Sequence, residues 1–286
     1  MKTLRESNVT IVGLGLMGGS LAGALRGHCH HVTGVDIEAE TLVLATERGL
    51  VDRASAELAE AVADADLVLL ATPVRTILRL LDEIGPLLKP GAVLMDLGST
   101  KAQIVAKMAD LPAHIAPLGA HPMCGKERAG IAAADPALYR GATFILTPLA
   151  RTTVAVLDLG RTLAATVGAH PLVLAAEHQD ALTATVSHLP YLLACALVAT
   201  ADVTTSSDPA AWEIVAGGFR DTSRVAGSDV TMMLDILLTN RAHVLPALST
   251  CVEQLERLSA LIDQGGEAVL RTTLATIRAQ RKEMFS

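Results

Sequence analysis

Hydrophobic and polar positions follow two different patterns along the chain, and the change falls near residue 175. Before it, short runs rich in Val, Ile and Leu alternate with stretches at helical spacing, which predicts right-handed βαβ crossovers and a parallel sheet. A helical stretch is expected around 153–167. The expected strands are NVTIVGLG (8–15), HVTGVDIE (31–38), ADLVLLATP (65–73), GAVLMDLGS (91–99), ATFILTP (142–148) and HPLVLAA (170–176).

After residue 175, Ala, Leu and Val recur at helical spacing without a strand pattern, so an all-α domain over 175–286 is expected to follow a first domain over 1–174. Several of these helices are apolar on more than one face, which favours a homodimer formed through the helical domain. The most apolar run, 189–201, is only 13 residues long. Because that is too short to span a bilayer, it is expected to be a buried helix and no membrane segment.

Three glycines separate the first expected strand from the first expected helix. In G-x-G-x-x-G, the first glycine permits the tight turn, the second lets the backbone approach a pyrophosphate, and the third allows helix and strand to pack closely. This motif predicts that the first domain is a Rossmann-like doubly wound α/β fold. The all-α C-terminal dimerisation domain then follows it. The alternative is a glycine-rich turn without a ligand. The expected dinucleotide-binding residues here are Gly13, Gly15, Leu16, Met17 and Gly18.

Asp36 ends the second expected strand. A carboxylate about twenty residues after the glycines is placed to accept hydrogen bonds from a ribose 2′-hydroxyl. The same charge would repel a 2′-phosphate, and no arginine follows directly in GVDIEAET. The sequence therefore predicts NAD rather than NADP as the cofactor.

Two further strand ends carry polar residues. Thr72 and Pro73 should line the cofactor where the strand order reverses, although they can equally form a simple turn. Ser99 and Lys101 follow the next strand and should lie at the ligand-binding edge of the sheet. Ser99 can also cap a helix beginning near Thr100, and the two roles are compatible.

His121 lies in the dense stretch GAHPMCGKERAG, where it is expected on a loop beside Pro122. A loop histidine is commonly just solvated, but this position after the last strands of a dinucleotide fold suits a catalytic base. In the helical half, Pro190 is expected to kink or begin a helix near His188.

Arg220 and Arg224 lie in GGFRDTSRVAGSD, which is expected to be a glycine-flanked turn. Two arginines beside glycines in an acidic protein favour a carboxylate-binding corner. The alternative is that each arginine is simply a solvated surface residue.

Charge and cysteine content narrow the class of protein. A formal net charge of -7 gives no basic footprint for nucleic acid, so no nucleic-acid partner is expected. The N-terminus has no apolar stretch typical of a secretory signal. The four cysteines lack disulfide or metal-ligand spacing, which predicts reduced thiols in the cytoplasm and no metal: Cys29, Cys124, Cys195 and Cys251.

Together these motifs resemble the prephenate and arogenate dehydrogenase family of tyrosine biosynthesis. The resemblance runs through GLGLMGGSLA, DLGSTK, GAHPMCGKERAG, SHLP and GGFRDTSR in order, over roughly residues 8–235. It implies NAD-dependent oxidative decarboxylation of prephenate or arogenate, with hydride leaving the carbinol carbon while aromatisation expels CO2.

The resemblance also implies roles for individual residues. His121 would accept or polarise the proton of the ring hydroxyl, and Ser99 would hydrogen-bond the same hydroxyl. Arg224 would hold a substrate carboxylate, Glu127 is similar to a charged gate residue, and His188 is the histidine of SHLP.

Two positions depart from the family pattern. Tyr191 stands where the family often has histidine after SHLP, and Gln179 stands at the histidine of a family HD pair, with His178 one residue earlier. Both bear on recognition of the substrate side chain. A neutral tyrosine hydroxyl can serve a keto acid or an amino acid, so it permits both substrates. Prephenate is favoured modestly because the resemblance implies that activity more commonly, and arogenate stays an alternative. Tyr191 can also simply pack at the kink.

Two other classes share the opening motif. β-Hydroxyacid dehydrogenases resemble the two-domain plan but use a lysine in the helical domain, and this chain has no lysine between Lys126 and Lys282. A non-catalytic NAD sensor would leave HPMCGKE and GGFRDTSR unexplained. The chain length is expected to leave no room for a regulatory or chorismate mutase domain.

Overall fold

The computed structural model describes residues 2–126, 128–205, 208 and 210–285. The chain divides into two compact units, Met1–Arg241 and Ala242–Ser286. The first unit contains the sheet and the first part of the helical region, and the second is a pair of long helices.

An eight-stranded sheet organises the first unit, with strand order β3-β2-β1-β4-β5-β6-β7-β8. The six strands expected from sequence are present. β3 and β6 were not predicted. β3 has only three residues, and APLGAHP in β6 has no β-branched residue, so neither has a clear strand pattern. All neighbours are parallel except β6 and β7, so the expectation of a wholly parallel sheet is corrected. The strands are β1 Asn8–Val12, β2 His31–Val35, β3 Arg53–Ser55, β4 Leu67–Leu70, β5 Val93–Asp96, β6 Ala116–Pro122, β7 Thr143–Thr147 and β8 His170–Val173.

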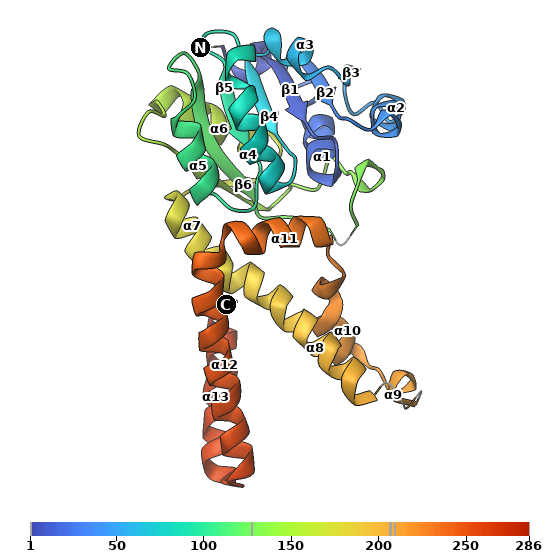
Figure 1. The fold of residues 1–286 in the computed structure, drawn as a ribbon, viewed down its shortest axis with the longest axis vertical. Helices are drawn as coiled ribbons and strands as arrows, with labels where there is room; N and C mark the ends of the chain where they lie inside the picture. The colour runs from blue at the N-terminus through green and yellow to red at the C-terminus, as the bar shows by residue number, and fades with distance from the viewer. Residues whose placement is uncertain (1, 127, 206–207, 209, 286) are drawn as a thin grey trace. The chain divides into compact units, whose positions relative to one another are not determined.

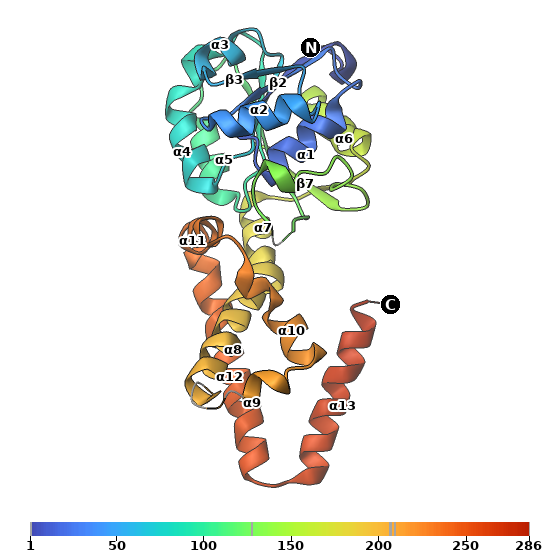
Figure 2. The ribbon, with the colours of Figure 1, turned by 90° about the vertical axis from the view of Figure 1, so that its right-hand side faces the viewer.

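Helices cover both faces of this sheet (Figures 1 and 2). α1, α2 and α6 pack on one face around Leu21 and Leu163, and α3, α4 and α5 pack on the other around Ile77 and Ile104. This double coverage explains why the central strands are apolar along their length. The helices are α1 Leu16–Leu25, α2 Ala39–Glu47, α3 Leu58–Ala63, α4 Val74–Glu83, α5 Ala102–Ala109 and α6 Val154–Thr166, with 3-10 turns η1 Leu4–Glu6, η2 Gly85–Leu87 and η3 Ile131–Ala133.

The helical region begins directly after β8. A π-helical turn, η4, precedes Pro190 and separates α7 from α8, which confirms the predicted irregularity at this proline. α7 packs against α5, and α11 packs against α4. The elements are α7 Ala176–Thr183, η4 Ala184–His188, α8 Leu189–Thr205, α9 Ala210–Glu213, α10 Gly217–Ser223, η5 Arg224–Gly227 and α11 Val230–Thr239.

The apolar run 189–201 differs from its expectation. It belongs to a continuous helical stretch, Ala176–Thr205, of 30 residues, which is long and apolar enough to cross a membrane by length and composition. Only 22% of its most apolar window is buried, whereas a buried helix was expected. Its length therefore does not exclude a span, and its apolar surface is available for a partner.

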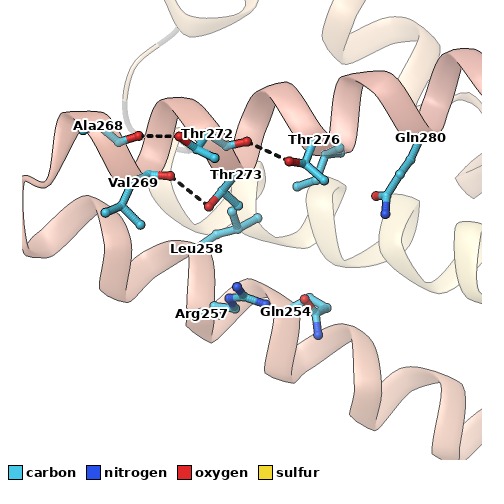
Figure 3. Close-up of a pocket in the computed structure, with 10 residues that line it drawn as sticks. Gln254, Arg257, Leu258, Ala268, Val269, Thr272, Thr273, Thr276 and Gln280 are labelled. Atoms are coloured by element: carbon cyan, nitrogen blue, oxygen red, sulfur yellow. Dashed lines mark hydrogen bonds between the residues drawn. The ribbon is translucent and has the colours of Figure 1, made fainter.

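The second unit is a helical hairpin of α12 (Arg241–Asp263) and α13 (Glu267–Glu283), joined at Gly265 with φ +64°. A groove of about 790 Å3 runs between the two helices (Figure 3). Threonine hydroxyls along it donate to carbonyls of their own helix, at 2.9 Å for Thr272 and 3.0 Å for Thr276. None of the residues lining this groove is a predicted site residue.

Candidate active site

Four strand ends place the predicted site residues at one edge of the sheet. β1, β4, β5 and β6 are parallel, so their carboxyl ends all meet there. The glycine turn follows β1, Thr72 follows β4, Ser99 follows β5, and His121 lies near the end of β6. Ligands of open α/β sheets bind at this edge.

The glycine turn has the geometry that each glycine was predicted to supply. Gly13 has φ +93°, and a Cβ there would lie 2.9 Å from the carbonyl oxygen of Ala71. A Cβ on Gly18 would lie 1.8 Å from the Gly13 carbonyl oxygen, so only glycine allows α1 to approach the turn. At Gly15 a Cβ would meet nothing within 4 Å, which leaves open space beside the N-terminus of α1.

Two side chains at this turn can serve a dinucleotide. Asp36 accepts the Leu14 N–H at 2.7 Å and the Glu38 N–H at 3.0 Å, one on each carboxylate oxygen. Each oxygen keeps a further acceptor position for a ribose hydroxyl. The Thr72 hydroxyl oxygen is buried, and no described residue forms a hydrogen bond with it. The open space at Gly15, the Asp36 carboxylate and the Thr72 hydroxyl therefore fit NAD, while Pro73 is exposed and begins α4 as its N-cap.

A pair of alanine substitutions tests this cradle. Gly15→Ala should leave the unfolding midpoint within about 2 °C of wild type, because its Cβ meets no protein atom. It should nevertheless weaken NAD binding by roughly 10-fold or more, since the methyl enters the space left for the pyrophosphate. Gly13→Ala should lower stability by about 1–3 kcal/mol because of its left-handed backbone.

Thermal unfolding and calorimetric NAD titration measure the two effects. Unchanged NAD affinity in Gly15→Ala would mean that the cofactor does not approach the turn at this position.

His121 lies in strand β6, not on a loop as the sequence suggested, and it is only 8% exposed. Burial lowers the pKa of His121 to about 3, with a further contribution from the nearby Lys101 charge and from His188, while Gln179 opposes the shift. Its Nδ1 atom is buried and has no hydrogen-bond partner among the residues that the structure describes. A neutral imidazole at the ligand-binding edge can accept a hydrogen bond or a proton.

Lys101 is fully buried and belongs to the framework around His121. Its ammonium group pairs with the carboxylate of Asp96 and donates to the carbonyl of Ala120, the residue before His121, at 2.7 Å. Burial lowers the pKa of Lys101 and raises that of Asp96, because desolvation disfavours both charges. Lys101 is thus buried at this edge of the sheet, where it contacts the strand that carries His121.

Ser99 and α5 show how the helical region completes this edge. The Asp180 carboxylate accepts the N–H groups of Lys101 at 2.7 Å and Ala102 at 2.8 Å, so it caps α5. The alternative of Ser99 as the cap is therefore wrong. The carbonyl of Ser99 accepts a hydrogen bond from Gln179 Nε2 at 3.3 Å, and Ser99 is half-buried.

His188 ends the π-helical turn and is 1% exposed. Asn240 Nδ2 donates to the Asp180 carbonyl at 2.7 Å, which fixes its amide orientation, and it lies 3.2 Å from His188 Nδ1. His188 Nδ1 is then an acceptor, and the ring proton lies on Nε2. Burial lowers the pKa of His188 to about 4, so it is a neutral donor at physiological pH.

The remaining predicted substrate residues lie on the helical region. Arg220 and Arg224 are exposed, on α10 and at the start of η5, so the segment is helical and the expected glycine-flanked turn is wrong. η5 packs against α8, which carries the half-buried Tyr191. Burial, with a contribution from Cys195, raises the pKa of Tyr191 and keeps it neutral. Glu127 lies outside the described residues.

Sequence reasoning missed two carboxylates that join the helical region to the sheet domain. Asp180 caps α5, as described above. Asp235 of α11 accepts the Arg75 N–H at 2.9 Å at the start of α4 and pairs with its guanidinium at 2.9 Å. Both capped helices follow strand ends that carry site residues. The only sequence signal for Asp235 is that it is an aspartate within an apolar helical pattern. Its partner, Arg75, lies 160 residues away in the sequence.

Comparisons with known proteins agree with this architecture. The family model described as "Prephenate dehydrogenase, nucleotide-binding domain" matches residues 21–173, and "Prephenate dehydrogenase, dimerization domain" matches 175–276. The first match begins after the glycine turn, so the geometry of that turn is an independent observation.

Individual relatives extend over most of the chain. Prephenate dehydrogenase of Bacillus subtilis is 31% identical over 91% of this chain and 71% of its own length. The crystal structure of prephenate dehydrogenase from A. aeolicus with hydroxyphenyl propionate and NAD+ has a TM-score of 0.91 at 32% identity, covering 99% of this chain and 100% of that one. Synechocystis arogenate dehydrogenase has a TM-score of 0.82 at 30% identity, covering 97% and 99%.

Proposed function

The chain belongs to the prephenate dehydrogenase family, and we propose that it converts prephenate to 4-hydroxyphenylpyruvate with NAD+ in tyrosine biosynthesis. It is an NAD-dependent dehydrogenase, as its relatives and its glycine turn indicate. The observation that carries the proposal is the shared sheet edge. It brings the dinucleotide turn to the same side as a buried, neutral His121 and as Ser99.

The proposed reaction assigns a role to each group at this edge. NAD+ supplies the hydride acceptor when bound, on the turn at Gly13, Gly15 and Gly18. His121 takes the proton of the ring hydroxyl as hydride leaves the carbinol carbon, and Ser99 hydrogen-bonds the same oxygen. The bond to the ring carboxylate then breaks, and its electron pair completes the aromatic ring. The proton returns to the oxygen, so the products are 4-hydroxyphenylpyruvate, CO2 and NADH.

The helical region is proposed to bind the rest of the substrate. Arg224 would hold a carboxylate, because its planar guanidinium can bind this planar anion through two parallel hydrogen bonds. His188 would donate from Nε2 without adding charge, because its Nδ1 is occupied by Asn240. Tyr191, close after His188 in sequence, would meet the substrate side chain. Glu127, which lies outside the described residues, keeps its proposed role as a charged gate residue after HPMCGK.

The cofactor preference gives a direct test of Asp36. We expect kcat/KM for NAD to exceed that for NADP, because the Asp36 carboxylate repels a 2′-phosphate and residues 37–47 carry no Lys or Arg. Steady-state rates with each cofactor at saturating substrate measure this preference. Equal or better use of NADP would contradict the assignment of Asp36 to the ribose.

Substrate preference tests the proposed function and Tyr191 together. NADH formation should be faster in kcat/KM with prephenate than with arogenate, and Tyr191→Phe should change the ratio because it removes the hydroxyl near the side chain. An unchanged ratio would leave Tyr191 as a packing residue. A strong wild-type preference for arogenate would make arogenate dehydrogenase the correct activity, and turnover of neither would overturn the proposal.

Assembly and location follow from the same features. We propose a homodimer through the helical domain, which begins after residue 174 between β8 and α7. Support comes from its exposed apolar side chains, which include Val203, Ile214 and, in the second unit, Ile262. The family model for its matched region is described as a dimerization domain. The chain carries four free thiols, which suits the cytoplasm, and neither a nucleic acid nor a membrane is proposed as a partner.

A further inference from the structure

Among the buried polar atoms that have no hydrogen-bond partner in the described part of the chain are His121 Nδ1 and Gln179 Oε1, next to the proposed reaction centre. Gln179 is fully buried, and His121 is 8% exposed. Gln179 lies close enough to His121 to influence its pKa. Leaving two buried polar atoms without partners is costly, so the pair calls for a functional explanation. One is a ring nitrogen that can carry a proton, and the other is an oxygen that can only accept one.

The orientation of the Gln179 amide is fixed by its nitrogen. Nε2 lies 3.0 Å from Asp180 Oδ1, 3.3 Å from the Ser99 carbonyl oxygen and 3.4 Å from the Thr183 hydroxyl. A side-chain amide has only two protons to donate, so these acceptors saturate it. Flipping the amide would turn its oxygen towards the Asp180 carboxylate, and Oε1 is therefore held on the other side.

We propose that Gln179 Oε1 accepts a hydrogen bond from Nδ1–H of His121 and so holds the imidazole in the tautomer whose Nε2 acts on the substrate hydroxyl. The inference rests on the proposed role of His121. Gln179 is thus a positioning residue, which acts on the reaction through the histidine. It stands where the family pattern has a histidine, so the contact is proposed for this chain's own glutamine.

Two further observations support this assignment. Gln179 raises the pKa of His121, the direction expected of an acceptor near a ring N–H. The second amide of the site, Asn240, acts on the other histidine in the opposite sense, because its nitrogen faces His188 Nδ1. The two amides would therefore give neighbouring histidines opposite tautomers, with Nε2 as acceptor in His121 and as donor in His188.

Nitrogen-15 NMR of the histidine rings tests the proposal without relying on turnover. In the ligand-free wild type at neutral pH, the His121 resonances, assigned by their loss in His121→Asn, should show Nδ1 protonated. Gln179→Met should abolish this preference and leave the His188 tautomer unchanged. Asn240→Leu should change the His188 tautomer and leave the His121 tautomer unchanged. An unchanged His121 tautomer in Gln179→Met would overturn the proposal.

Kinetics add a second readout. Gln179→Met should lower kcat by roughly 10-fold or more, with KM and NAD affinity near wild type, because the wrong tautomer impairs proton transfer. Thr183→Val is the matched control: it removes a contact on the nitrogen side of the same amide and should keep the His121 tautomer. If Gln179→Met does not fold, Gln179→Asn, whose shorter amide fails to reach the ring, replaces it.

These outcomes separate the inference from the proposed function. If Gln179→Met loses the His121 tautomer but wild type turns over neither substrate, the proposed activity is wrong and the Gln179–His121 hydrogen bond is supported. If wild type turns over substrate but the His121 tautomer does not depend on Gln179, the proposed activity stands and the Gln179–His121 hydrogen bond is wrong.

Discussion

His121→Asn should lower kcat by roughly 100-fold or more and leave NAD affinity unchanged, because it removes a general base without touching the glycine turn. His114→Asn is the matched control, since His114 precedes the same strand but is exposed. Its kcat should remain within about 2-fold of wild type, as expected for a surface change. Stopped-flow and steady-state NADH formation, with calorimetric NAD titration, measure both effects.

The low pKa of His121 determines how kcat/KM should vary with pH. A histidine with a pKa of about 3 is already neutral above pH 5, so kcat/KM for the free enzyme should show no acid limb from His121 between pH 5 and 9. The residual rate of His121→Asn should be low throughout this range. Near-normal turnover by the variant from pH 6 to 9 would show that His121 is not the general base.

Arg224→Ala should mainly weaken substrate binding, by roughly 2–5 kcal/mol, if substrate binding removes water from the pair, because the substrate carboxylate then loses its charged partner. Arg220→Ala is the control, four residues earlier on α10 and equally exposed in the structure, and it should cost much less. KM and inhibition by a substrate analogue, measured for both variants, give the ranking. The reverse ranking would move the carboxylate ligand to Arg220.

Local patterns predicted the parts of the fold and site that depend on neighbouring residues. The strand-turn-helix at Gly13, Gly15 and Gly18 needs only short-range steric constraints, and the φ of Gly13 and the close approach at Gly18 agree with it. The irregularity before Pro190 likewise follows from the missing proline N–H.

Long-range contacts account for what the sequence did not reveal. β6 was missed because its pairing with β5 and β7, rather than β-propensity, makes it a strand, and His121 was therefore placed on a loop. Asp180 reaches α5 across 79 residues of sequence, which no local pattern encodes. Arg224 was assigned to a turn because glycines flank it, yet the backbone there is helical.

The central claim is that one enzyme couples hydride transfer from the carbinol carbon to loss of the ring carboxylate. Purified protein supplied with prephenate and NAD+ tests it most directly when NADH absorbance and released CO2 are followed in the same reaction. The account predicts that NADH and CO2 form in equimolar amounts together with 4-hydroxyphenylpyruvate. NAD binding without NADH formation from either prephenate or arogenate would contradict it.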